Sequence, residues 1–201
     1  MKKFLAITSI GACLFASAAF AKTEGSSVGV QLFRANVDYR SSYDNTKYDD
    51  TLRGGVSVNY KHAHALPHNF YLSPGISYDY FGLSTDTTSA VHSFDKVKLN
   101  DRIAIRADIG YDINDASAVY VVIGHSSISY KAYDYTGSST AARNSHAFAP
   151  FYGLGLKTML VKNLDLTVEY THQNANLRAV SDPEKIKTMI ETMGVGLAYR
   201  F

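Results

Sequence analysis

The sequence predicts an all-β protein that folds as an eight-stranded antiparallel up-and-down transmembrane β-barrel. Apolar residues recur at every second position, which is the period of β-strands, and the connections between such segments alternate between long and short. No segment approaches the roughly 18 consecutive apolar residues of a transmembrane helix. A membrane location would therefore require strands closed into a barrel, in which every backbone group is satisfied.

The first 21 residues are expected to form a cleaved signal peptide, which leaves 22–201 as one barrel domain. Two lysines precede an uncharged, Ala-rich apolar run. Ala19 and Ala21 then form the small-x-small pattern that signal peptidase cuts, so Lys22 is the expected new N-terminus. The alternative is a lipoprotein cleavage box that ends on Cys13, but the apolar core before it would be only about seven residues long.

Composition excludes several classes of function. Cys13 is the only cysteine and lies in the signal peptide, so the mature chain has no thiol for a disulfide framework or a cysteine-bound metal site. Cleavage also removes two of the 20 basic residues and none of the 18 acidic ones, which leaves no net charge. Nothing therefore points to nucleic acid as a partner, and no cofactor is expected.

Eight strand segments are expected, joined by connections of two kinds. The segments lie at 27–39, 52–62, 70–82, 97–112, 118–131, 147–160, 164–174 and 188–201. Long polar connections lie at 40–51, 83–96, 132–146 and 175–187, and short ones at 63–69, 113–117 and 161–163. Short turns at one end and long loops at the other are typical of bacterial outer-membrane barrels, whereas a soluble sandwich has no reason to sort its loops this way.

In a membrane barrel the apolar face of each strand is turned toward lipid and the polar face toward the interior. Segment 97–113 is expected to place its alternating apolar residues on one such face, interrupted only by Asp101. The first segment changes the parity of its apolar residues after Leu32, which predicts a β-bulge near Arg34.

The last strand ends the chain on an aromatic residue, with every second residue apolar. Chain termini are usually frayed and polar, so this pattern favours a strand that closes the barrel against the first one. It is also similar to the C-terminal signal read by the outer-membrane barrel assembly machinery. The residues concerned are Val195, Leu197, Tyr199 and Phe201.

Several stretches of the second half resemble the OmpX/Ail family of small outer-membrane barrels. They are Tyr-Asp-Ile-Asn-Asp at 111–115, Ala-Val-Tyr-Val-Val-Ile-Gly at 118–124, Tyr-Gly-Leu-Gly-Leu at 152–156, Asn-Leu-Asp-Leu-Thr-Val-Glu-Tyr at 163–170 and Gly-Val-Gly-Leu-Ala-Tyr-Arg-Phe at 194–201. The order and spacing of these stretches carry the resemblance over roughly residues 100–201. The first half matches in pattern only, and the loops do not match.

The resemblance implies a barrel in the bacterial outer membrane, with both termini in the periplasm and four loops outside. Members of this family adhere to host cells and resist serum killing, so the resemblance also implies a surface-binding module. Aromatic and Arg side chains are favoured anchors in protein interfaces. The candidate surface contacts are Tyr43, Tyr48, Asp49, Phe94, Tyr133, Tyr135, Arg143 and Arg178.

The interior of an eight-stranded barrel is just wide enough to be filled by side chains, so an open porin is not expected. Inward-facing charges of both signs should form ion pairs there. The predicted polar network consists of Arg102, Arg106, Asp108, Asp165, Glu169 and Arg200, with Glu169 and Arg200 on neighbouring strands.

The sequence offers two chemical alternatives. His125 and Ser127 share a strand face, as in the lipid A-modifying hydrolase barrels, but the Asn-Ala-Gly expected after such a motif is replaced by Ile-Ser-Tyr at 128–130. A histidine bonded within the lumen is the simpler interpretation. His62, His64 and His68 could hold zinc, but no Cys or carboxylate lies beside them, so no metal site is expected.

Eight tyrosines near segment ends are expected to form the aromatic girdles at the membrane surfaces. They are Tyr60, Tyr78, Tyr80, Tyr111, Tyr120, Tyr130, Tyr170 and Tyr199.

The sequence thus favours a non-enzymatic outer-membrane barrel with binding loops. Its expected partners are the outer-membrane lipid bilayer, the barrel assembly machinery and, through the loops, host-surface or serum proteins. A purely structural barrel and a lipid A-modifying hydrolase are the alternatives.

Overall fold

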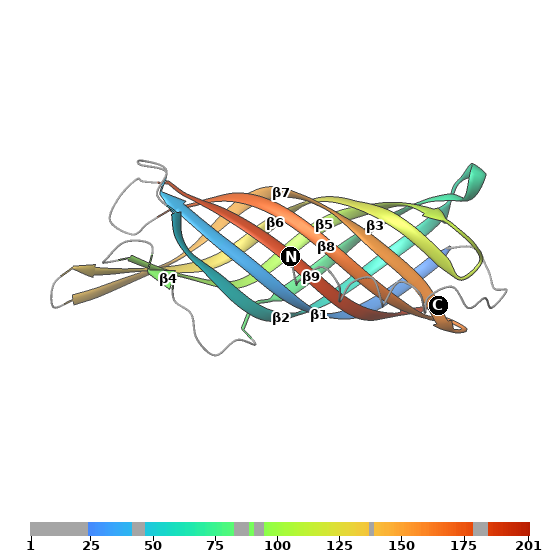
Figure 1. Ribbon diagram of the computed structural model, residues 1–201, viewed down its shortest axis with the longest axis horizontal. Coiled ribbons are helices and arrows are strands. Elements are labelled where there is room, and N and C mark those ends of the chain that lie inside the picture. The colour runs from blue at the N-terminus through green and yellow to red at the C-terminus, as the bar shows by residue number, and fades with distance from the viewer. Residues whose placement is uncertain (1–23, 42–46, 83–88, 91–94, 137–138, 179–184) are drawn as a thin grey trace, which may run out of the picture.

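A computed structural model describes residues 24–41, 47–82, 89–90, 95–136, 139–178 and 185–201, and the expected signal peptide lies outside this part (Figure 1). The strands are β1 (Gly25–Ser41), β2 (Lys47–Ala65), β3 (Phe70–Tyr80), β4 (Ser89–Ala90), β5 (Asp95–Asp112), β6 (Ser117–Thr136), β7 (Ser139–Val161), β8 (Leu164–Arg178) and β9 (Lys185–Arg200). A single 3₁₀ turn, Pro67–Asn69, precedes β3 within the described residues.

The eight long strands form one closed antiparallel sheet. Each pairs with its neighbours along the chain, β3 pairs with β5, and β9 returns to pair with β1. The two-residue strand β4 pairs with β5 near the start of β5, at Val97 and Lys96. The predicted fold class, including the number of spanning strands, is confirmed, and so is the closure of the last strand against the first.

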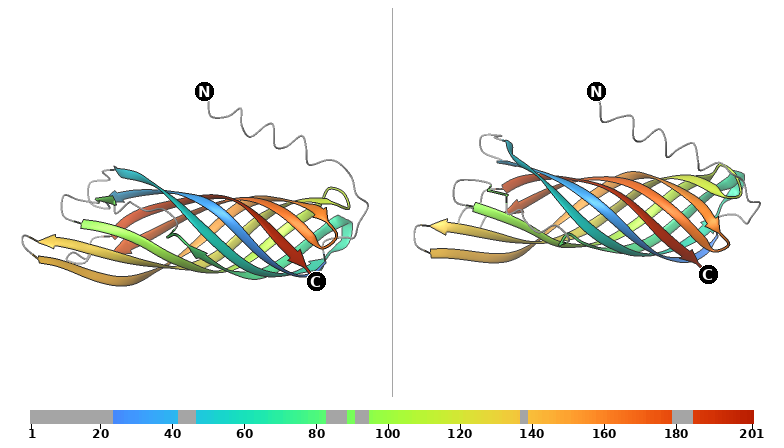
Figure 2. Two further views of the ribbon diagram at one scale, coloured as in Figure 1. Left: turned by 90° about the horizontal axis from the view of Figure 1, so that it is seen from below. Right: turned by 60° about the horizontal axis from the view of Figure 1, so that its bottom comes forward.

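The two ends of the barrel differ. The terminal end carries the start of β1, the end of β9 and the short connections at 66–69, 113–116 and 162–163. At the opposite end, which we call the far end, β6 and β7 project beyond the other strands as a two-stranded ribbon (Figures 1 and 2). The long loop predicted at 132–146 is wrong, because strand pairing continues to Thr136 and Ser139.

The outward face carries a belt of exposed apolar side chains. Ile105 is 72% exposed, Leu154 63% and Leu32 64%. In water such a surface would be unfavourable, whereas lipid accepts it. Among the described residues, no helix has the length and apolar character needed to cross a membrane.

Two predictions of strand facing are wrong. The pairing of β1 with β9 runs without a break past Arg34, and the irregularity with β2 lies between Val37 and Tyr39. The apolar residues after Leu32 therefore do not return to the lipid face. Regular alternation turns them inward. They are accommodated there because the far half of the interior is apolar.

The second error concerns β5. Its register with β6 shifts between Leu99 and Asp101, so a bulge at Asn100 exchanges the two faces of the strand. Val97 and Leu99 are buried inside the barrel, whereas Ile103 is 58% exposed. The apolar residues before the bulge thus pack in the interior of the far half, and those after it face the lipid.

Candidate functional site

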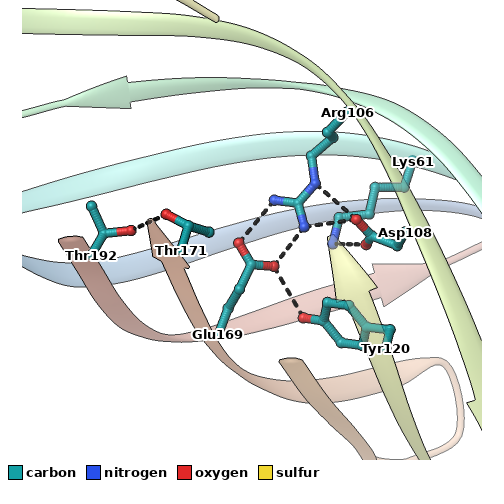
Figure 3. Close-up of polar contacts among 7 residues, drawn as sticks. All are labelled: Lys61, Arg106, Asp108, Tyr120, Glu169, Thr171 and Thr192. Carbon is teal, nitrogen blue, oxygen red and sulfur yellow. Dashed lines mark hydrogen bonds and ion pairs between the residues drawn. The ribbon is translucent and has the colours of Figure 1, made fainter. Parts of the chain in front are cut away.

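Polar side chains from β2, β5, β6 and β8 meet inside the barrel (Figure 3). The Arg106 guanidinium donates to both carboxylate oxygens of Glu169, at 3.0 Å and 2.6 Å, and also to Asp108 Oδ1. Lys61 Nζ donates to Asp108 Oδ2 at 2.7 Å, and Tyr120 Oη donates to Glu169 Oε2 at 3.1 Å. We call these five residues the polar cluster. Buried charges with this degree of pairing and hydrogen bonding hold a fixed arrangement.

The other predicted network residues form separate pairs. Arg102 Nε donates to Asp79 Oδ2 at 2.6 Å, nearer the far end. At the terminal end, Arg200 Nη2 donates to Asp165 Oδ1 at 2.8 Å. Glu169 and Arg200 therefore lie on neighbouring strands, as expected, but have different partners, because the guanidinium of Arg106 reaches Glu169 from β5 across the lumen.

Tyr120 is a member of the polar cluster that sequence reasoning assigned to an aromatic girdle. Its ring is buried and lies against Gly155 of the neighbouring strand, where a Cβ would overlap the ring. Tyr130 is also buried, with its hydroxyl bonded to the backbone of Arg178. The other six predicted girdle tyrosines are 40–54% exposed on the outward face.

Above the polar cluster, the far half of the lumen is packed with apolar side chains, which we call the apolar layer. Its members are Phe33, Ala35, Val37, Tyr39, Phe81, Val97, Leu99, Ile128, Tyr130, Ala132, Ala147, Ala149, Ala175, Leu177, Ile186 and Ile190. Sequence reasoning missed this layer. The parity change after Leu32 was its one visible signal.

Two buried polar residues that the sequence did not single out lie beside this layer. Arg53 donates to the carbonyl oxygens of Val97 and Leu99, next to the β5 bulge. Gln173 donates to Ser126 and to the carbonyl oxygen of Ala149. Gln173 follows Asp165 and Glu169 on the inward face at intervals of four, which was a usable signal.

Two small spaces lie inside the described part of the barrel. A cavity of about 40 Å³ near the terminal end is lined by polar residues including Lys157, Asp165 and Arg200, which is room for a few water molecules. A second space of about 10 Å³ lies between Arg102 and Arg106. Among the described residues, each of these two spaces has room for water molecules.

The candidate hydrolase residues do not face the lumen. His125 is exposed on the outward face, so the prediction of a histidine bonded within the lumen is wrong, and Ser127 lies on the same face. In the described part of the chain, no carboxylate bonds to either of them. The direction follows from the strand alternation, because Ser126 and Ile128 point inward.

The histidines near the turn between β2 and β3 do not form a metal site with other described residues. The rings of His62 and His64 are 4.5 Å apart on β2, and His62 Nδ1 is 2.8 Å from the Ser26 hydroxyl. Among the described residues, no three His, Cys, Asp or Glu side chains are grouped to hold a metal ion.

Six of the eight predicted surface contacts lie on described strands, near their far ends. Arg143 on β7 and Arg178 on β8 are exposed. Tyr48 and Asp49 belong to β2, and Tyr133 and Tyr135 to β6. Tyr43 and Phe94 lie outside the described residues.

The wall of the barrel is split at the far end between β7 and β8. Their pairing stops at Phe151 and Gln173, although β7 contains twelve earlier residues and β8 five later ones. Residues 139–150 pair only with β6, and residues 174–178 only with β9. Each strand therefore presents an edge that no other described strand occupies, and we call this split the β7–β8 seam.

Known structures share this fold. Ail of Yersinia pestis aligns with a TM-score of 0.54 and 16% identity over 89% of this chain and all of that chain. Ail in complex with the heparin analogue sucrose octasulfate gives a TM-score of 0.53 at the same identity and coverage. Neisserial surface protein A gives 0.46 and 15%, over 89% of this chain and all of that one. No curated relative matches the sequence.

The family comparison agrees with the geometry. A model described as the outer membrane protein beta-barrel domain matches residues 7–201. Such barrels have short periplasmic turns and longer extracellular segments, so the terminal end faces the periplasm and the far end faces outward. The chain belongs to the outer membrane protein beta-barrel family and is a protein of the bacterial outer membrane.

Proposed function

We propose that this protein is a surface-binding barrel whose far end attaches to host-surface or serum proteins. The observation that carries the proposal is the β7–β8 seam. An unpaired strand edge presents a row of backbone donors and acceptors, and an extended peptide can add to it as a further strand. The ribbon of β6 and β7 holds this edge beyond the lipid belt, where a partner has access.

The free side of β7 can be assigned from one residue. Pro150 has no N–H, yet it pairs with His125 on β6. Its backbone groups must therefore face away from β6, toward the seam. Residues two and four positions earlier, Phe148 and His146, share this orientation, because backbone direction alternates along a strand.

The proposal is tested by the variant His146→Pro, with His146→Ala as the matched control. Both remove the same exposed side chain, but only proline removes an N–H from the free edge. Bacteria that express His146→Pro should adhere to cultured epithelial cells several-fold less than those with His146→Ala. Equal amounts of the heat-modifiable folded band on an unboiled gel would show that both barrels assemble.

Other outcomes point to the other roles. Equal adhesion by the two variants would exclude strand addition at His146. No adhesion by the unsubstituted protein, with unchanged lipid A acyl chains by mass spectrometry, would favour a purely structural barrel. The similar Ail barrel was solved in complex with the heparin analogue sucrose octasulfate, which supports a binding role for this barrel as well.

The proposed route to the membrane has two steps. Removal of residues 1–21 would start the mature chain at Lys22, and the barrel assembly machinery would read the last strand. Val195, Leu197, Tyr199 and Phe201 all lie on its outward face, where a receptor could contact them before the barrel closes. Mass spectrometry of the mature N-terminus tests the first step, and the membrane yield of a Phe201→Ser variant tests the second.

A further inference from the structure

The β8 edge of the seam is met by a side chain from inside the barrel. The Arg178 amide N–H donates to Tyr130 Oη at 2.8 Å, and the same hydroxyl donates to the Arg178 carbonyl oxygen at 3.4 Å. Tyr130 is a buried residue of β6, so it reaches β8 through the lumen, past β7, which lies between the two strands in the sheet. One hydroxyl thus meets both backbone groups that Arg178 would offer to an added strand.

These backbone groups face the seam and not β9. Pro150 shows that every second residue of β7 turns its backbone groups toward β8, and Tyr152, two residues later, pairs with His172. His172 and every second residue after it, as far as Arg178, therefore turn their N–H and C=O groups toward β7. At Arg178 the Tyr130 hydroxyl takes the place that a β7 backbone would have.

The base of the seam is also held by a side chain. Gln173 Nε2 donates to Ser126 Oγ at 2.6 Å and to the carbonyl oxygen of Ala149 at 2.9 Å. Gln173 belongs to the last residue pair before the split, so it ties β8 to both β6 and β7 at that point. Together with Tyr130 at the tip, it fastens both ends of the β8 stretch that does not pair with β7.

Another gap in the wall is covered in a similar way. The pairing of β3 with β5 stops at Tyr80 and Asp101, although β5 contains earlier residues. The Arg53 guanidinium of β2 donates to the carbonyl oxygens of Leu99 and Val97 in this part of β5, at 3.2 Å and 3.4 Å. Buried side chains thus cover backbone groups on two strand edges at the far end.

The edge of β7 differs from these two. Among the described residues, no side chain bonds to the seam-facing backbone groups of His146 or Phe148. Phe148 is 73% exposed on the outward face, whereas Ala147 and Ala149 are buried on the inward face. Because side chains on neighbouring strands meet face to face, an added strand would place its alternate residues beside Phe148 and beside these alanines. Apolar side chains suit both positions.

We propose that Tyr130 makes the seam one-sided. Its hydroxyl closes the β8 edge, so the partner is an extended segment with alternating apolar side chains that pairs with β7 alone. The inference rests on the strand addition proposed above and adds the edge, the partner chemistry and the residue that selects between the edges. Tyr130 is a positioning residue, because it acts through the backbone of β8 and does not contact the partner.

The experiment uses the purified full-length barrel in neutral detergent. The probe is a short peptide of alternating Thr and Val residues, blocked at both ends and carrying a photoreactive group. Mass spectrometry of the cross-linked protein should place the label on residues 139–150 and not on 174–178. Tyr130→Phe keeps the ring and removes the hydroxyl, so it should raise the label on 174–178 several-fold. The control Tyr111→Phe removes a hydroxyl from the exposed tyrosine near the terminal end of β5 and should leave the pattern unchanged.

Amide hydrogen exchange gives a second readout that needs no peptide. In the unsubstituted protein the Arg178 amide should exchange more slowly than that of Asn176, which faces the same seam, although Arg178 lies nearer the strand end. Tyr130→Phe should speed exchange at Arg178 roughly fivefold, as expected for the loss of one hydrogen bond. The comparison of Arg178 with Asn176, and the label on the unsubstituted barrel, stay informative if the variant folds poorly.

The outcomes separate this inference from the proposed function. Equal label on both edges of the unsubstituted barrel, or exchange at Arg178 that Tyr130→Phe leaves unchanged, would overturn the role of Tyr130 while strand addition stands. Absence of label from both edges in every variant would overturn strand addition itself, and this inference with it.

Discussion

At the scale of single residues, Glu169 shows how a charge is kept inside the barrel. Both of its carboxylate oxygens accept hydrogen bonds from Arg106, and one also accepts from Tyr120. Because Arg106 also bonds to Asp108, which is held by Lys61, the loss of one member leaves a partly unpaired charge in the lumen.

We therefore expect Glu169→Ala to lower the free energy of unfolding by about 3–5 kcal/mol, the usual cost of breaking a buried ion pair from one side. Urea titration of the barrel in lipid vesicles, followed by the folded band on gels, measures this loss. The double variant Arg106→Met and Glu169→Met should recover much of it, because no lone charge is left. A Glu169→Ala barrel as stable as the unsubstituted one would contradict the structural role.

At the scale of elements, the bulge in β5 allows one strand to serve two environments. Residues before Asn100 contribute to the apolar layer, and residues after Asp101 present Ile103 and Ile105 to lipid. The backbone at this point is anchored, since the amide N–H of Phe81 donates to the carbonyl oxygen of Asn100 at 3.0 Å.

Deletion of Asn100 should turn Val97 and Leu99 toward the outside and Lys98 inward, because a shift of one residue exchanges the faces of a strand. We expect a clear loss of the folded band at temperatures that the unsubstituted barrel tolerates. Asn100→Ala keeps the chain length and the carbonyl oxygen, so it serves as the control and should melt near the unsubstituted protein. Equal melting of the deletion variant would show that the bulge does not set the register.

At the scale of the whole molecule, two layers of side chains follow one another along the described part of the lumen. The polar cluster closes its middle, and the apolar layer fills the far half. The spaces of about 40 Å³ and about 10 Å³ beside the polar cluster have room for a few water molecules at most, so we expect a closed lumen.

Planar-bilayer recordings should therefore show no stepwise conductance. The double variant Arg106→Ala and Glu169→Ala should also stay closed, because the apolar layer is intact. Reproducible large steps from the unsubstituted barrel would contradict the sealed lumen. Steps from the double variant alone would show that the polar cluster is the only barrier.

The sequence by itself determined the strand count, the antiparallel order, the membrane class and the inward position of Asp108 and Glu169. These follow from local alternation and from turn lengths, which are properties of neighbouring residues. The resemblance of the second half to the OmpX/Ail family also predicts a location in the outer membrane.

Only the tertiary structure decided which inward residues meet. The partner of Glu169 lies on β5, across the lumen, and a pattern along one strand carries no information about the opposite wall. Alternation gives two faces of a strand but not the environment of each face. The apolar residues from Phe33 to Tyr39 therefore predict a bulge near Arg34, where the structure has regular pairing. The β7–β8 seam was likewise invisible, because the end of strand pairing depends on how far two separate strands extend together.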